Sequence, residues 1–226
     1  SYSNPTTMRA FVFTGMLLLG TGFLFAQDED KEIKTLFGGN GEVDHSGWGG
    51  PMLQYGQIMD QDALFVGGRG GWLIDHRFTL GGAGYGLVSR ITNSDYDEYA
   101  SNEGQNGIRE YRFEVGYGGV LLEPTIHHDK PVHITIPILI GAGGCTYSLH
   151  RSDSVSPGPG DNWYDNDDQA FFVTQATVEA EMNVIDFVRV GLGVGYMYTS
   201  KIDLPETEKD VLNGARFQFV IKFGRF

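Results

Sequence analysis

The stretch GGRGGWLIDHRFTLGGAGYG, residues 67–86, decides the fold of this chain. Its glycines either cradle a phosphate group or let chain segments pack closely. No three of them follow the G-x-G-x-x-G spacing of a dinucleotide-binding turn, and no helical pattern comes after them. In residues 63–74, apolar side chains at even positions alternate with odd positions that include Arg69, which predicts a strand with two unlike faces. Residues 75–77 predict a tight turn into a second strand, so the stretch is interpreted as a β-hairpin.

The same period-two alternation recurs along most of the chain, whereas helical periodicity is nearly absent. Between Val188 and Tyr198, for example, aliphatic and aromatic residues alternate with Arg189 and three glycines. Eight strands are expected, at about residues 47–58, 63–74, 78–91, 111–121, 132–140, 172–182, 188–198 and 217–223. The sequence therefore predicts an all-β fold, with glycines placed where the wall must curve or approach a neighbour.

The links between these strands differ in length in a regular way. The links at residues 75–77, 127–130 and 183–187 are short, and so is the first link at 59–61. The links at residues 92–108, 151–168 and 201–213 are longer and polar. Short turns at one end and longer loops at the other are typical of a transmembrane up-and-down antiparallel β-barrel.

The two faces of each strand indicate which surface meets lipid. A water-soluble barrel places its apolar residues inside, whereas a membrane barrel places them outside. We therefore expect the apolar face of every strand to point outward, including Tyr111, Phe113, Val115 and Tyr117. The interior of an eight-stranded barrel has room only for side chains, so the opposite, charged faces should fill a closed or narrow lumen. The predicted lumen charge network is Arg69, Arg112, Glu114, Glu179, Glu181, Arg189, Arg216 and Lys222.

The N-terminal region predicts export. Met8 and Arg9 precede an apolar run over residues 11–25, which is shorter than the roughly 20 residues that a membrane helix needs and fits a cleaved signal peptide. An acidic chain begins at Asp28. We divide the chain into upstream residues plus signal peptide (1–26), a periplasmic or lumenal segment (27–46) and the barrel (47–226).

The composition excludes several kinds of partner and metal site. The net charge of −13 would repel phosphate backbones, so nucleic acid is not expected as a partner. The chain has a single cysteine, Cys145, which excludes an internal disulfide and a multi-cysteine metal centre.

Taken together, the signal peptide, the eight alternating strands, the alternately short and long links and the terminal Phe226 resemble the small outer-membrane β-barrel proteins of Gram-negative bacteria, of the outer-membrane protein A type. The resemblance covers roughly residues 43–226. It implies a location in the outer membrane, with membrane lipid as a partner. Phe226 departs from the pattern, because it is out of phase with the outward Phe217 and Phe223 unless a bulge near Gly224 intervenes.

Three groups of residues are candidates for specific binding. The histidines His45, His76, His127 and His128 are expected at the periplasmic rim with His133, where they could hold zinc or another divalent ion, although solvated turns carry the same residues. The acidic loops at 92–108 and 151–168 could bind divalent cations or a protein partner. The loop aromatics Tyr96, Tyr99, Trp163 and Tyr164 could add contact area, and Tyr85, Tyr147 and Tyr196 could form an outer girdle.

The sequence favours a non-catalytic outer-membrane barrel without a cofactor, with a structural role or a role in contacts made by its loops. Two alternatives remain open. The His150-x-Ser152 spacing is compatible with an outer-leaflet lipid hydrolase, and a soluble exported barrel could bind an apolar ligand.

Overall fold

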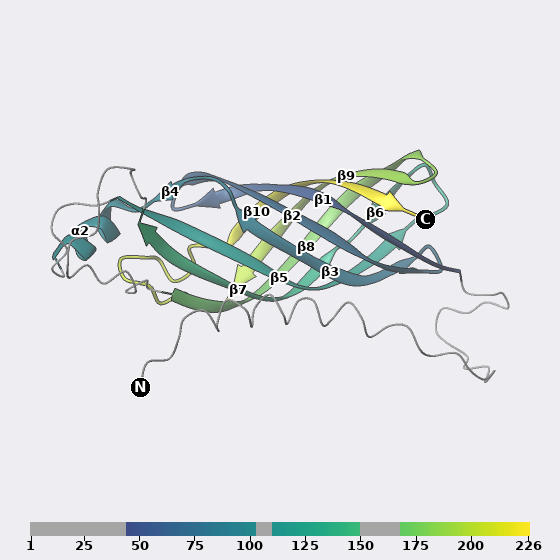
Figure 1. Ribbon diagram of the computed structural model, residues 1–226. Coiled ribbons are helices and arrows are strands. Elements are labelled where there is room, and N and C mark those ends of the chain that lie inside the picture. The colour runs from purple at the N-terminus through teal and green to yellow at the C-terminus, as the bar shows by residue number, and fades with distance from the viewer. Residues whose placement is uncertain (1–43, 103–109, 150–167) are drawn as a thin grey trace, which may run out of the picture. The chain divides into compact units, whose positions relative to one another are not determined.

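A computed structural model describes residues 44–102, 110–149 and 168–226, and the expected signal peptide lies outside this range. Within it the chain forms ten strands and one helix (Figure 1). The elements are β1 His45–Ile58, β2 Gln61–Ile74, β3 Phe78–Leu87, β4 Ile91–Thr92, α2 Ser94–Asn102, β5 Tyr111–Ile126, β6 Val132–Thr135, β7 Ile138–Leu149, β8 Asp168–Ile185, β9 Val188–Thr199 and β10 Gly214–Gly224.

The strands pair antiparallel with their neighbours, and pairing of β1 with β10 closes the sheet into a ring. β6 and β7 both pair with β5 and β8, so they are one wall strand interrupted at Ile136 and Pro137, where proline cannot donate a ladder hydrogen bond. β4 adds only two residues beside β5. In the described part of the chain the wall therefore has eight positions, and the predicted antiparallel barrel is confirmed.

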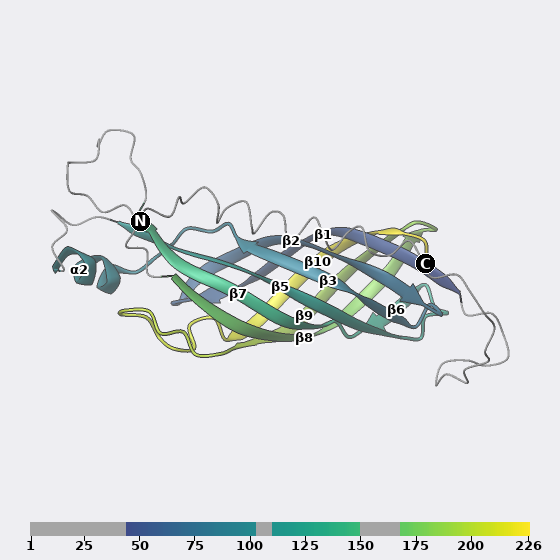
Figure 2. The same cartoon turned by 60° about the horizontal axis from the view of Figure 1, so that its bottom comes forward.

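The two ends of the barrel differ (Figures 1 and 2). The turn end carries the tight links after β2, β5 and β8 and the chain terminus at Phe226. Asp75 and His76 at this end have φ values of 53° and 54°, and two consecutive positive values are typical of the tight hairpin turn. The loop end carries the longer links, and α2 lies in the link that we expected to be a plain loop.

The glycines of the opening stretch bring β2 and β3 close together. An added Cβ at Gly81 would lie 2.0 Å from the carbonyl oxygen of Gly70, and one at Gly67 would lie 2.1 Å from that of Gly84. Side chains at these positions would force the strands apart. The opening stretch is a hairpin, as predicted, and these glycines serve its packing.

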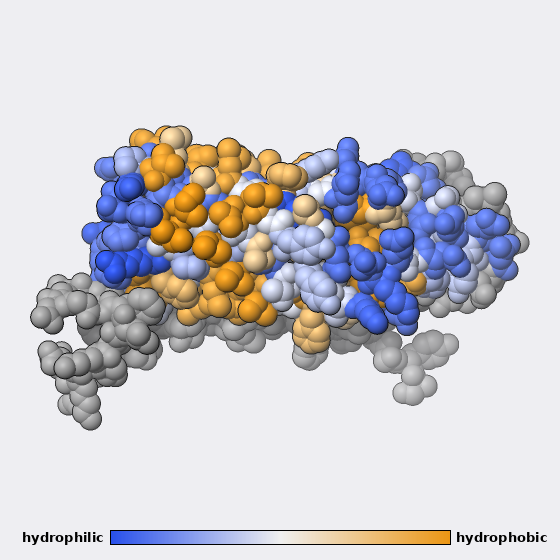
Figure 3. All heavy atoms as spheres, turned by 180° about the vertical axis from the view of Figure 1, so that it is seen from behind, coloured by the Kyte–Doolittle hydropathy of each residue, from blue (hydrophilic) through white to orange (hydrophobic). Residues whose placement is uncertain are grey.

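The outer surface of the barrel is apolar over much of its length. Figure 3 shows hydrophobic residues over the half of one face nearer the turn end and hydrophilic residues toward the loop end. Exposed apolar side chains come from every long wall strand; they include Leu53, Val66, Trp72, Leu80, Val120, Ile140, Phe172, Val178, Leu192, Tyr196 and Phe217.

Candidate functional site

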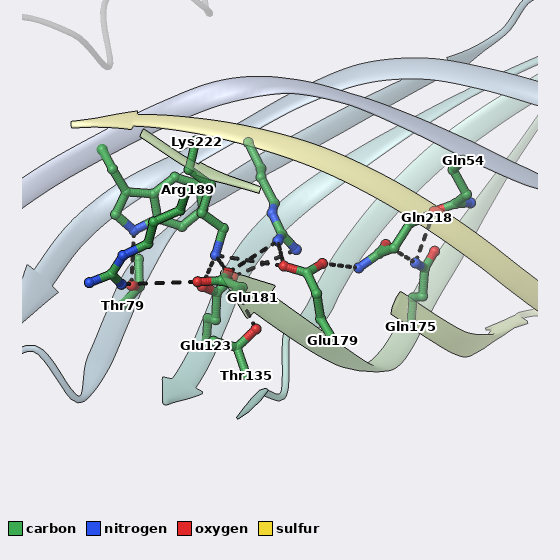
Figure 4. A network of polar contacts seen from close by, with 12 residues as sticks. Gln54, Thr79, Glu123, Thr135, Gln175, Glu179, Glu181, Arg189, Gln218 and Lys222 are labelled. Carbon is green, nitrogen blue, oxygen red and sulfur yellow. Dashed lines mark hydrogen bonds and ion pairs between the residues drawn. The ribbon is translucent and has the colours of Figure 1, made fainter. Parts of the chain in front are cut away.

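The most distinctive site is a layer of buried charged residues inside the turn-end half of the barrel, which we call the charge layer (Figure 4). Because side chains alternate across a strand, every second residue of five wall strands points inward at this level. Its members, all buried, are Arg69 on β2, Glu123 on β5, Glu179 and Glu181 on β8, Arg189 on β9 and Lys222 on β10.

The basic and acidic groups of the charge layer are interleaved. The guanidinium of Arg69 donates to the Glu179 carboxylate and lies 3.6 Å from Glu123. The Lys222 ammonium donates to both Glu123 and Glu181 and lies 3.8 Å from a Glu179 oxygen. Each carboxylate therefore has at least one cation beside it.

Arg189 completes the charge balance, because its Nη1 lies 4.0 Å from Glu181 Oε2. The described charge layer thus has three carboxylates and three cations and is neutral when His133 is neutral. Neutrality matters here because an unpaired buried charge is costly in a dry interior.

Side chains around the charge layer extend its contacts toward the turn end. His133 Nε2 lies 3.1 Å from Glu181 Oε2. The Lys222 ammonium lies 4.1 Å from the centroid of the Trp48 ring, and the Trp48 Nε1–H donates to Thr79 Oγ1 at 3.1 Å. The ammonium is therefore held by carboxylates on one side and by an aromatic face on another.

A layer of neutral amides lies next to the charge layer, on its loop-end side. Gln54 Nε2 donates to the Tyr117 hydroxyl at 2.6 Å, Tyr117 donates to Gln175 Oε1 at 3.1 Å, and Gln175 Nε2 donates to Gln54 Oε1 at 2.9 Å. These three bonds form a closed ring. Gln218 joins the layers by donating to Glu179 Oε2 at 2.9 Å (Figure 4).

Aromatic and aliphatic side chains occupy the interior at the loop end. Tyr96 of α2 stacks on Tyr147 with ring centroids 3.7 Å apart, and Asn93 Nδ2 donates to the Tyr147 hydroxyl at 2.9 Å. Ile202 and Leu212, from the link before β10, are fully buried beside them. We call α2 and this link the lid. Tyr96 is buried in the lid, and Tyr147 and Tyr85 are buried inside the barrel. The predictions that Tyr96 adds contact area for a partner and that Tyr85 and Tyr147 form an outer girdle are therefore wrong.

A smaller apolar cluster occupies the interior at the turn end. Trp48, Leu73 and Leu121 are buried there, and Phe226 packs against them. The Phe226 ring lies 4.0 Å from the guanidinium carbon of Arg189. The terminal aromatic is thus in the inward phase, and no bulge returns it to the outward phase of Phe217 and Phe223.

The charge layer brings together five of the predicted lumen residues: Arg69, Glu179, Glu181, Arg189 and Lys222. Arg216 also points inward, but it lies nearer the loop end, where its Nη2 donates to the Leu212 carbonyl at 2.6 Å. Its guanidinium is 5.8 Å from the Phe65 ring centroid, apart from the carboxylates.

The prediction that Arg112 and Glu114 face the lumen is wrong. Both point outward from β5, Glu114 is exposed and accepts a 2.5 Å hydrogen bond from Ser148 Oγ, and Tyr111 and Phe113 are buried inside. Period-two alternation separates two faces but does not say which one is inside. In the loop-end half of the barrel the interior is aromatic, so the polar face of β5 is the outer one.

The sequence analysis missed two members of the site, for different reasons. Glu123 lies beyond the strand expected at residues 111–121, and its inward phase is that of Phe113, which was expected on the outer face. His133 was expected at the rim but is buried in the lumen beside Glu181. Once β5 is inverted, its sequence pattern places Glu123 correctly.

The predicted rim histidines lie at the turn end without forming a metal site. His76 Nε2 is 3.1 Å from Asp44 Oδ2, His128 accepts a 3.2 Å hydrogen bond from Arg77 Nε, and His45 packs on Trp72 with centroids 5.1 Å apart. His127 sits in the following turn with φ of 59°. Within the described ranges no group of three or more His, Cys, Asp or Glu side chains could hold a metal ion.

The remaining candidates fall largely outside the described residues. His150, Ser152, Trp163 and Tyr164 all lie in the segment at 150–167. The acidic side chains Asp95 and Asp97 are in the first turn of α2, where they complement its N-terminal partial charge. No helix in the described ranges is long and apolar enough to cross a membrane.

The described residues form a closed ring of eight antiparallel wall strands with buried charges and an apolar exterior, which is the fold of the small outer-membrane β-barrel proteins. Neisserial surface protein A has a similar structure, with a TM-score of 0.52 over 81% of this chain and 99% of its own, at 11% sequence identity. The attachment invasion locus protein Ail of Yersinia pestis, in complex with the heparin analogue sucrose octasulfate, gives a TM-score of 0.42 over 82% of this chain and 99% of its own, at 10% identity. No protein-family model matches the sequence, and no curated protein sequence matches it significantly.

Proposed function

We propose that this chain is an integral β-barrel protein of the bacterial outer membrane. The observation that carries the proposal is the inverted distribution of polarity across the wall. Phe172 is 77% exposed and Leu192 is 64% exposed, whereas Glu179 and Lys222 are at most 1% exposed. Such an exterior is costly in water and favourable in lipid. A closed barrel also suits lipid because its backbone hydrogen bonds are all made between its own strands.

The orientation follows from the lengths of the links. In outer-membrane barrels the short turns face the periplasm and the longer loops face outward. The turn end would then be periplasmic, reached after export and removal of a signal peptide at residues 1–26. Trp72, exposed near this end, would lie at the inner interface, where aromatic side chains are favoured.

We further propose that the lumen is closed and that the protein is non-catalytic. The charge layer neutralises itself, the amide layer satisfies its own hydrogen bonds, and apolar side chains lie at both ends. Such an interior stabilises the barrel wall, and contacts with other molecules are then left to the loop end. Its acidic surface includes a hollow of about 780 Å³ between the β1–β2 tip and the lid, lined by Asp60, Asp95, Glu206 and other residues, which favours cationic partners.

Location is tested by membrane fractionation, followed by comparison of boiled and unboiled samples on a gel. We expect recovery with the outer membrane and a change of migration on heating, because a closed barrel resists detergent until it is boiled. Recovery in the soluble fraction without a heat shift would favour a soluble exported barrel instead. Single-channel recording then tests the lumen, and a large steady conductance would contradict closure.

A further inference from the structure

The outer wall has a hollow of about 470 Å³ near the loop end, between the link that follows β3 and the face of β5. The register explains it. β3 pairs with β5 as far as Gly86 opposite Gly116, and pairing resumes where Ile91 of β4 lies opposite Phe113. Four residues, 87–90, therefore span the distance that two residues cover on β5, so they bow away and leave a gap.

Two glycines keep the hollow open. Gly116 on β5 and Gly144 on β7 both line it. An added Cβ at Gly116 would meet nothing closer than 3.5 Å, and one at Gly144 nothing closer than 3.7 Å, in contrast to the 2.0 Å clash at Gly81. Backbone packing therefore does not demand glycine at either position. Their effect is to leave space on the outside of the wall.

The lining combines both signs of charge with hydroxyl groups. Arg90 and Arg112 supply guanidinium groups, and Ser89 and Thr146 supply hydroxyls. Arg90 Nη2 is 2.5 Å from Glu110 Oε1, with both side chains about half exposed, and Glu114 also lines the hollow. The hollow thus offers donors for an anion and acceptors for hydroxyl or amide groups.

The hollow also lies where the exterior changes from apolar to polar. Along β5 the outward residues run from Arg112 and Glu114 through two glycines to Val120, which is exposed and apolar. Val88, 58% exposed, lies in the lining, and Phe172 of β8 pairs with Ala142, two residues along β7 from Gly144. In the proposed orientation this border is the level of the outer-leaflet head groups.

We propose that this hollow binds the phosphorylated sugar head group of an outer-leaflet glycolipid. The phosphate accepts hydrogen bonds from the Arg90 and Arg112 guanidinium groups, which suit a phosphate because they present paired donors. Sugar hydroxyl or amide groups donate to Glu114, and the acyl chains lie against the apolar wall below. Glu114 already accepts one hydrogen bond, from Ser148 Oγ at 2.5 Å, and a plain anion has no donor to add to it, whereas a sugar hydroxyl or amide does. The proposal rests on the proposed membrane location and names the lipid that this wall recognises.

Binding is measured on the purified full chain in neutral detergent by native mass spectrometry. The probes are bisphosphorylated lipid A, the same lipid with its phosphates removed, and inorganic phosphate as a competitor. Arg90→Gln and Gly144→Leu test charge and space separately. We expect each to weaken binding of the phosphorylated lipid by about tenfold or more, since one charge-assisted bond or a blocked site is lost.

Matched controls separate these effects from general changes. Lys209→Gln removes a positive charge at the same end, and Gly82→Leu adds an outward side chain to β3 away from the hollow, where an added Cβ would have 3.5 Å of clearance. Both should bind as the unchanged chain does. All variants must keep the heat-dependent gel shift, so that a folding defect is not mistaken for lost binding.

The outcomes are distinguishable from failure of the proposed function. If the unchanged chain shows no change of migration on heating, the proposed membrane location itself is wrong. If the barrel is membrane-integrated but binds both lipids equally, or if Arg90→Gln and Gly144→Leu bind as the controls do, the head-group site is wrong. Displacement of the lipid by inorganic phosphate at similar concentrations would show an anion site without preference for the glycolipid, and would also overturn the proposal.

Discussion

Substitution of Lys222 by methionine tests whether the charge layer is held together by its neutrality. Lys222 contributes one of the three described cations that face Glu123, Glu179 and Glu181, and its ammonium donates to two of them. Methionine keeps most of the length and apolar volume of the side chain beside Trp48. The substitution therefore removes charge with little loss of packing and leaves one uncompensated negative charge in the lumen.

The magnitude follows from the burial of the partners. Glu181 and Glu123 are each 1% exposed, so water cannot take over the role of the ammonium. Removing one partner of a buried ion pair costs about 3–5 kcal/mol. Urea unfolding of the barrel in lipid vesicles should show this as a shift of the midpoint by roughly 2 M, taking an m-value of about 2 kcal/mol/M.

Two further variants make the test specific. Lys222→Met combined with Glu181→Gln restores neutrality, and its free energy of unfolding should return to within about 1–2 kcal/mol of the unchanged chain. Lys201→Met removes an exposed cation at the loop end and should change it by less than about 0.5 kcal/mol. If Lys222→Met is no more harmful than Lys201→Met, or if the double variant is no more stable than the single one, neutrality is not what stabilises the layer.

Three other predictions concern the wall and the lid. Gly81→Ala should lower the free energy of unfolding by about 1–3 kcal/mol, because its Cβ would clash with the Gly70 carbonyl, whereas Gly86→Ala, with open space around the added Cβ, should stay within about 0.5 kcal/mol in the same urea titration. Tyr96→Ala removes the stacking on Tyr147, so limited proteolysis should cut the lid faster while the urea midpoint of the barrel is unchanged. Leu192→Arg should cost about 2–4 kcal/mol in vesicles if this outward residue lies near the middle of a bilayer, and a cost near zero would argue that it faces water.

Much of the fold could be predicted from the sequence because the alternation of residues is local. Two unlike faces in the sequence indicate each strand, and the turn at residues 75–77 indicates the hairpin between β2 and β3. Strand order in an up-and-down barrel then follows from the chain order. The helix α2 was missed because it is short, polar and held by Asn93 and Tyr96, whose partners lie on distant strands.

The direction in which each face points was harder to predict, because it depends on the surroundings of the strand. A single rule, with apolar residues outward, places Arg69, Glu179 and Lys222 inside but puts Arg112 and Glu114 on the wrong side. The closed ring of Gln54, Tyr117 and Gln175 could not be predicted from the sequence. These residues lie on β1, β5 and β8 and come together only when the barrel closes.

The error on β5 has a physical cause that divides the barrel into two parts. Toward the turn end the exterior is apolar, so the inward faces carry the charged groups, and those groups must pair with one another. Toward the loop end the face in Figure 3 is polar and so is the outer face of β5, with Arg112 and Glu114, whereas Phe113 and Tyr147 pack inside as in a water-soluble barrel. A strand that crosses from one part to the other must exchange the polarity of its two faces without changing its phase.

β5 makes this exchange between the exposed Glu114 and the exposed Val120. The glycines between them have no side chain that needs a polar or an apolar environment, and they make the exchange possible. The border of the proposed membrane can thus be placed on β5 from side-chain polarity alone, and the hollow beside Gly116 lies at that border.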